Sequence, residues 1–124
     1  MMRKPAVILI ASSAALAAAL IATGCQSPWV QATVVNDEET PVNLVEVNYP
    51  GGSFGIQNIA PHSSFHYRFH ILTDDRVEVD FTDAAGHSQA VKGPELDPGE
   101  EGTLRIDIQA GDRVVWSTNL KPGK

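Results

Sequence analysis

The sequence contains a single cysteine, Cys25, and this scarcity excludes several classes of protein. One thiol cannot form an internal disulfide, and it cannot supply the paired cysteines of a zinc or redox site. Basic residues are also few: after residue 25 the chain carries seven lysines and arginines against fifteen aspartates and glutamates, a formal net charge of −8. A domain this acidic repels phosphate backbones, which excludes general nucleic-acid binding and adhesion to lipid through a basic patch as main functions.

The chain is also short. Of its 124 residues, the first 24 form a separate N-terminal segment, and about 100 remain for folding. That length suits one domain, because two domains would each be too small to bury a sufficient core. It does not suit a Rossmann, TIM-barrel or α/β-hydrolase enzyme. We expect one domain over residues 30–120 and a tail at 121–124.

Long apolar runs occur only near the N-terminus. Arg3 and Lys4 precede Ala6 to Ala22, a stretch of 17 residues without a charge. This length reaches only the lower edge of a membrane span, which takes roughly 17–25 residues. Small residues follow the stretch directly, as they do in a processed export signal. Residues 1–24 are therefore predicted to be a cleaved signal peptide.

This segment runs into the sequence Ala22-Thr23-Gly24-Cys25. It resembles the lipobox of bacterial lipoproteins, in which small or β-branched residues precede an acylated cysteine, although Ala22 stands where leucine is usual. The resemblance implies a diacylglycerol thioether and an acylated N-terminus at Cys25, so that palmitate-type chains anchor the protein in the lipid bilayer of a bacterial cell envelope. Gln26, in place of aspartate, implies sorting to the outer membrane if the organism has two membranes.

The alternative is an uncleaved anchor helix with an incidental cysteine. Acylation is favoured, because a free thiol is a liability in an oxidising envelope and because two or more acyl chains give stable anchoring. Only Gln26 to Trp29 separate Cys25 from the first predicted strand, and four extended residues span roughly 13–15 Å. The domain is therefore expected to lie against the bilayer surface. There Trp29 either inserts as an interfacial aromatic anchor or caps the core.

From Val30 onward, apolar residues alternate with a period of two, and no stretch shows the 3.6-residue period of a helix. Seven or eight short strands are predicted, the third and sixth of them weak. Their ranges are Val30 to Asn36, Val42 to Tyr49, Phe54 to Asn58, Ser64 to Leu72, Arg76 to Thr82, His87 to Lys92, Thr103 to Gln109 and Arg113 to Asn119. One apolar face per strand predicts an all-β, antiparallel, immunoglobulin-like β-sandwich, with a small open β-barrel as the alternative. Phe81 and Trp116 are predicted to be buried.

The fourth and fifth of these strands are predicted to pair as a hairpin around Thr73 to Asp75, because their apolar faces must point the same way. The expected inner pairs are Ile71 with Val77, Phe69 with Val79 and Tyr67 with Phe81. The expected outer pairs are His70 with Glu78, Arg68 with Asp80 and His66 with Thr82. Opposite charges would then face each other across the strands, and Glu78 would favour protonated His70.

Gly51-Gly52-Ser53-Phe54-Gly55 matches the Gly-x-Ser-x-Gly pattern, which works as a nucleophile when a strand-to-helix turn exposes the serine. No helical pattern follows the match, so we interpret it as a turn between strands. A small serine hydrolase is a remote alternative that would need His87 or another histidine within reach of Ser53. No catalytic or cofactor-binding residue is predicted, and the chain is expected not to be an enzyme.

Metal binding is not predicted either. His62, His66 and His70 recur every four residues, which would converge on one ion on a helix, but on a strand such neighbours stand roughly 13 Å apart. Acidic residues gather at the turns, and calcium between these loops is the open alternative. The acidic stretches are Asp37 to Glu39, Asp74 to Asp75, and Glu95 to Glu101.

These observations favour a non-catalytic binding or structural module that is anchored to a membrane and holds an envelope protein as its partner. The alternative is a small-ligand or carbohydrate-binding module. Such a module would need two or three aromatic side chains aligned on an exposed face, and Tyr49, Tyr67 and Trp116 are the residues that could form it.

Overall fold

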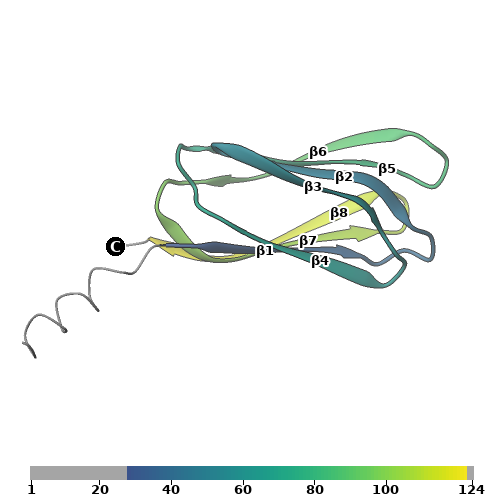
Figure 1. Ribbon diagram of the computed structural model, residues 1–124, viewed down its shortest axis with the longest axis horizontal. Helices are drawn as coiled ribbons and strands as arrows, with labels where there is room; N and C mark the ends of the chain where they lie inside the picture. The colour runs from purple at the N-terminus through teal and green to yellow at the C-terminus, as the bar shows by residue number, and fades with distance from the viewer. Residues whose placement is uncertain (1–27, 123–124) are drawn as a thin grey trace, which may run out of the picture.

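The computed structural model describes residues 28–122, so the predicted signal peptide and Cys25 lie outside the described residues (Figure 1). Eight strands follow one another along this part of the chain. They are β1 (Val30–Asn36), β2 (Val42–Tyr49), β3 (Gly52–Ile59), β4 (Ser63–Phe69), β5 (Asp75–Thr82), β6 (Ser88–Leu96), β7 (Glu100–Gln109) and β8 (Arg113–Pro122). Within residues 28–122, no helix is long and apolar enough to cross a membrane.

The strands form two four-stranded sheets that pack face to face (Figure 1). Sheet A has the order β4-β1-β7-β8, and sheet B has the order β3-β2-β5-β6. The predicted β-sandwich is therefore confirmed. One feature differs from the antiparallel prediction, because β1 and β7 pair in parallel, with Val30 beside Gly102. A parallel pair needs a long crossover, and the five strands between β1 and β7 supply it.

The core lies between the sheets and consists of the inward side of each alternating strand. Its fully buried large apolar side chains include Val30, Val34, Val47, Val77, Val79, Phe81, Leu96, Leu104, Ile106 and Ile108. Phe81 is 2% exposed, as predicted. Trp116 is only partly buried and packs against the edge of the core, so the prediction of a buried side chain holds only in part for this residue.

A bulge in β2 explains why its apolar pattern is irregular. Leu44 adopts a left-handed backbone conformation (φ 51°), and the pairing of β2 with β5 shifts register at this point. The extra residue turns both Val42 and Val45 toward the core, while Leu44 itself is 63% exposed. Bulges of this kind bend a strand and re-aim its side chains.

The predicted hairpin between the fourth and fifth strands is wrong. β4 pairs with β1 in sheet A, whereas β5 lies between β2 and β6 in sheet B. None of the six expected cross-strand pairs forms, and Arg68 and Asp80 lie on the outer faces of different sheets. Alternation determines which face a side chain takes, but it does not determine which strand lies beside it.

The segment 70–74 carries the chain from sheet A to sheet B instead of forming a hairpin loop. Ile71 is buried, and its carbonyl oxygen accepts a hydrogen bond from the backbone N–H of Gly99. The N–H of Leu72 donates to the carbonyl oxygen of Pro50. These contacts hold the crossing segment against the β2–β3 and β6–β7 turns.

The two ends of the sandwich are different. The start of β1 and the end of β8 lie at one end, here called the N-terminal end, together with the 70–74 crossing (Figure 1). The opposite, distal end carries the β1–β2, β3–β4, β5–β6 and β7–β8 connections. There the fully buried amide of Asn36 donates to the carbonyl oxygens of Thr40 and Ile59, both at 2.9 Å, and to that of Ala60 at 3.2 Å.

Candidate interaction surface

Ser53 does not lie in a nucleophile elbow. Its motif spans the β2–β3 turn and the start of β3, and the chain continues as a strand, not as a helix. Ser53 is exposed and pairs with Asn48 near the N-terminal end. His87 lies at the distal end, where its Nδ1 is 3.8 Å from an Asp83 oxygen. Among the described residues, no hydrogen bond joins Ser53 to a histidine.

The three histidines in and beside β4 have separate surroundings. His62 Nε2 lies 2.9 Å from Glu39 Oε1, and His66 Nδ1 lies 3.1 Å from Thr33 Oγ1. His70 Nδ1–H donates to the carbonyl oxygen of Pro28. The side chains do not converge, and between residues 28 and 122 no three His, Cys, Asp or Glu side chains are placed to hold a metal ion.

Three carboxyl groups gather at the distal end, which the sequence pattern did not indicate. Asp83 is nearly buried, and its Oδ1 accepts hydrogen bonds from the backbone N–H groups of His87 (2.9 Å) and Ala85 (3.0 Å). These bonds, led by that from His87, lower the pKa of Asp83 despite its burial. The pKa of Asp112 is raised, mainly by burial and next by its interaction with Asp83. The pKa of Glu38 is also raised, mainly by burial and next by the negative charges of Asp112 and Asp83.

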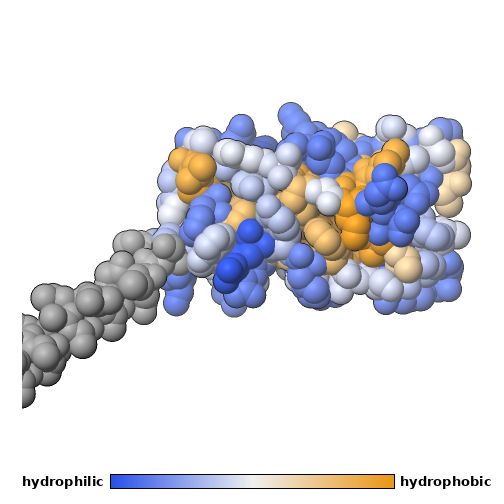
Figure 2. Space-filling view, in the orientation of Figure 1, coloured by the Kyte–Doolittle hydropathy of each residue, from blue (hydrophilic) through white to orange (hydrophobic). Residues whose placement is uncertain are grey.

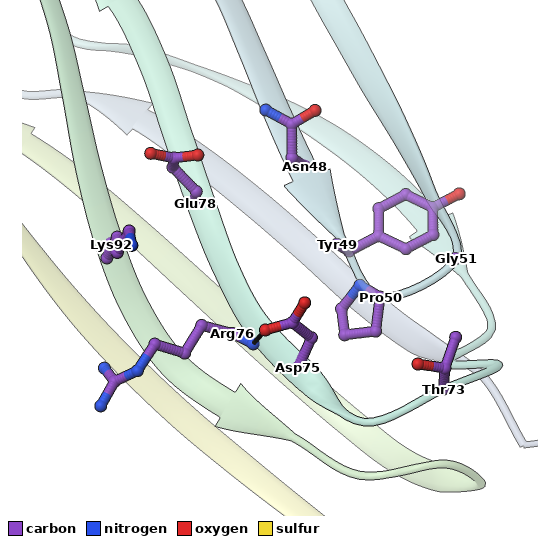
Figure 3. Close-up of a pocket in the computed structure, with 9 residues that line it drawn as sticks. All are labelled: Asn48, Tyr49, Pro50, Gly51, Thr73, Asp75, Arg76, Glu78 and Lys92. Atoms are coloured by element: carbon purple, nitrogen blue, oxygen red, sulfur yellow. Dashed lines mark hydrogen bonds between the residues drawn. The ribbon is translucent and has the colours of Figure 1, made fainter.

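A hollow of about 500 Å³ lies on the outer side of sheet B near the N-terminal end (Figure 3). Its charged groups include Asp75, Arg76, Glu78 and Lys92. Figure 3 shows the Arg76 side chain directed away from Asp75, and its Nη1 donates to the carbonyl oxygen of Gly93 at 3.0 Å. The lining combines both signs of charge and includes no serine, cysteine or histidine.

A cluster of three side chains lies on the outer face of sheet A at the N-terminal end. The rings of Trp29 and His70 lie against each other with their centroids 3.6 Å apart and their planes tilted by 31°, and the Arg68 guanidinium lies 4.3 Å from the indole centroid. Cation–π contacts of this kind are worth about 0.5–1 kcal/mol when exposed. Trp29 therefore does not cap the core. Together with the bond from His70 to Pro28, the cluster holds the chain in place just before β1.

Beside this cluster, a hollow of about 290 Å³ lies between β1 and β4 on the same outer face. The side chains around it are the amide of Gln31, the hydroxyl of Thr33, the imidazole of His66 and the guanidinium of Arg68. Ala32 and Tyr67 complete the lining, which includes no carboxylate. We call this feature the donor-rich hollow. Its chemistry suits an anionic group such as a carboxylate, which amide, hydroxyl and guanidinium groups can all bind by hydrogen bonds.

A set of stacked aromatic rings lies on the side of the sandwich where the edge strands β3 and β4 face each other. We call it the aromatic seam, and it consists of Tyr49, Phe54, Phe65, Tyr67 and Phe69. Phe54 stacks on Tyr67 at 4.4 Å, and Tyr67 is still 40% exposed. Figure 2 shows apolar surface on this side, between β3 and β4.

Tyr67 and Phe69 were expected on the inner face of their strand, and Phe69 is buried there, whereas the position of the seam at an open side leaves Tyr67 partly uncovered. The same position argues against a flat platform for sugars. Tyr49 stacks on Phe69 between the sheets, and Trp116 packs on the opposite side of the sandwich, so the three candidate aromatics do not align on one exposed face.

Comparison with known proteins gives information on the fold alone. No protein-family profile matches the chain, and no curated protein matches it in sequence. Among solved structures, the chain is similar to a protein from Eubacterium rectale whose structure was determined by NMR, with a TM-score of 0.53 and 14% sequence identity. The match covers 77% of this chain and 91% of that protein. At this level of identity, the likeness shows a shared β-sandwich fold.

Proposed function

We propose that this protein is a lipid-anchored module of the bacterial cell envelope, which binds another envelope protein close to the membrane surface and catalyses no reaction. The observation that carries this proposal is the position of Cys25. It is the chain's single cysteine, it stands where the lipobox pattern requires an acylated residue, and it lies three residues before Pro28, the first residue that the structure describes.

The structure of the N-terminal end supports a position close to the bilayer. Pro28 and Trp29 are held on sheet A by His70 and Arg68, so they do not act as a free linker. Only Gln26 and Ser27 separate Cys25 from Pro28, and three Cα-to-Cα steps span roughly 10–11 Å at full extension. The acyl chains at Cys25 would therefore hold this end of the sandwich against the headgroups, and the outer membrane is the expected site in a bacterium with two membranes.

The surfaces around β4 support binding as the activity. The aromatic seam leaves Tyr67 partly exposed, and the donor-rich hollow beside it presents Arg68 and His66 in a lining that includes no carboxylate. Partly exposed apolar surface beside oriented polar groups is typical of a protein-binding site. Ser53 lacks both a helix behind it and a histidine partner, and the aromatics form no sugar platform, so the two alternatives gain no support.

Metabolic labelling with a palmitate analogue tests the anchor. We expect the wild-type protein, expressed in a bacterial host, to take up the label and to fractionate with membranes, and Cys25→Ser to lose both properties. Gln26→Asp is the matched control, because it should keep the label and change only the membrane to which the protein is sorted. Label on Cys25→Ser, or an unlabelled wild-type protein, would contradict the proposal.

A further inference from the structure

We propose that the free edge of β4 binds an extended strand of a partner protein in which apolar and acidic side chains alternate. This inference rests on the proposed function, since it names the class of partner that the membrane-anchored module would hold. Three features carry it: the geometry of the β4 edge, the aromatic seam on one side of that edge, and the donor-rich hollow on the other.

The β4 edge is regular along its whole length. β4 is an outer strand of sheet A, and its seven residues pair with β1 without a register shift, from Val30 beside Phe69 to Asn36 beside Ser63. The strand contains neither proline nor a bulge, the devices that commonly protect an edge from further pairing. By contrast, β6 contains Pro94 at a register shift in its pairing with β5. The edge of β4 is about 23 Å long, and its outward N–H and C=O groups can pair with an added strand.

The inner side of an added strand would lie over the aromatic seam. Side chains at alternate positions would contact Tyr67 and Phe65, the two members of the seam on β4 that are partly uncovered. Aromatic and β-branched residues pair well with such rings across strands. Apolar residues are therefore expected at every second position of the partner strand.

The outer side of the same strand would lie beside His66 and Arg68. The Arg68 guanidinium is held over Trp29, so its position is set before a partner binds. The donor-rich hollow behind it includes no carboxylate that could already occupy these groups. Acidic side chains at the intervening positions would complement Arg68, whereas basic ones would be repelled. β3 also presents an edge, but its outward residues Ser53, Gly55 and Gln57 are uncharged and select no sign of charge.

A second copy of this chain fits the edge poorly. β4 itself contains no acidic side chain, so the edge of a second copy would offer Arg68 no opposite charge, whichever way the two strands run. A parallel, in-register pair would set Arg68 beside Arg68, which is unfavourable. The partner is therefore a different chain.

Two short acetylated peptides test the inference, one with alternating valine and glutamate and one with alternating valine and lysine. The protein purified from the bacterial host in neutral detergent is mixed with each fluorescent peptide at low salt, and binding is measured by polarisation. We expect the glutamate peptide to bind and to slow amide hydrogen exchange in β4 but not in β8. Arg68→Glu should weaken this peptide about tenfold or more and strengthen the lysine peptide. Arg113→Glu is the matched control, because Arg113 is an exposed arginine on β8.

Tyr67→Ser provides a second variant and should weaken both peptides, because it removes apolar contact and not charge. Circular dichroism of each variant shows whether it folds. The inference is overturned if neither peptide binds, if the two bind equally, if protection appears on β3 or β8 in place of β4, or if the protein instead dimerises through β4. Failure of palmitate labelling with normal peptide selectivity would contradict the anchor alone, and normal labelling without selectivity would contradict this inference alone.

Discussion

Gly93 in β6 lies directly against the indole ring of Trp116 in β8, so that a Cβ atom at position 93 would stand 2.7 Å from three ring atoms. The two strands are edge strands of opposite sheets, on the side of the sandwich away from β3 and β4. The ring therefore bridges the sheets where no backbone hydrogen bonds do. This side is covered by an indole, whereas the β3–β4 side leaves the exposed ring of Tyr67.

Gly93→Ala should destabilise the protein by about 1–3 kcal/mol, the usual cost of forcing extra volume into a packed site. The cause is specific to one ring, so the same change in a Trp116→Ala background should cost little. Urea denaturation of the wild type, the two single variants and the double variant measures this coupling. An equal cost of Gly93→Ala in both backgrounds would show that the contact is not responsible.

Phe81→Ala should lower the free energy of unfolding by about 3–5 kcal/mol, because Phe81 is buried in the centre of the core and its removal leaves a cavity. That is a large part of the roughly 5–15 kcal/mol expected for a whole domain. Ser53→Ala serves as the control, because Ser53 is exposed and should leave the free energy unchanged. A loss below about 1 kcal/mol at Phe81 would disagree with its position in the core.

Asn36→Ala should destabilise the protein by about 1–3 kcal/mol, because three carbonyl oxygens at the distal end would lose the donor that satisfies them. Asn36→Asp should be worse at neutral pH, since a carboxylate cannot donate to carbonyl groups and would be fully buried. Asn43→Asp, at an exposed position in β2, is the control. Equal thermal midpoints for the two aspartate variants at neutral pH would refute this role for Asn36.

The sequence pattern was sufficient for the class of fold and for most strands, because alternation reports directly which face of a strand is buried. The first two predicted strands, for example, have the observed bounds. Strand partners were not predictable in the same way. Val77 and Phe81 face the core equally well whether β5 pairs with β4 or with β2, and the choice depends on the route of 70–74 between the sheets.

The candidate binding surface was only partly visible in the sequence. The alternation over Ser64 to Leu72 indicated a strand with His66 and Arg68 on its outer face, and β4 is that strand, although it ends at Phe69 and His70 follows it. The neighbours of that face come from distant segments: Trp29 lies 41 residues before His70, Thr33 lies 33 residues before His66, and both reach β4 through its pairing with β1. Local pattern contains no signal for such contacts. The extension of β6 through Gly93 was missed for a related reason. Glycine and proline at these positions predict a loop, and the local sequence does not reveal that Gly93 packs against Trp116 of a distant strand.

The carboxyl groups at the distal end should give the folding stability a characteristic dependence on pH. The pKa of Asp112 and that of Glu38 are raised in the folded state, so the folded protein binds these protons more tightly and gains stability as the pH falls through those folded values. The pKa of Asp83 is lowered, so its contribution is present above its unfolded value and is lost as the pH falls through its folded value. On acidification from neutral pH, we therefore expect the thermal midpoint first to rise and then to fall.

Asp112→Asn removes one of the two carboxyl groups whose pKa is raised. Asparagine tolerates the left-handed conformation that Asp112 adopts (φ 60°) and can still donate a hydrogen bond to Asp83, but it has no negative charge to repel Asp83 and Glu38. The variant should have a higher thermal midpoint than the wild type at neutral pH, and this advantage should shrink on acidification, because the wild-type Asp112 then becomes protonated. Asp74→Asn is the control, because Asp74 is exposed in the 70–74 crossing, far from these carboxyl groups. It should change neither the thermal midpoint at neutral pH nor the dependence of the midpoint on pH. A lower midpoint for Asp112→Asn at neutral pH, or an advantage that stays constant across the titration, would mean that repulsion among these carboxylates does not govern the stability of the distal end.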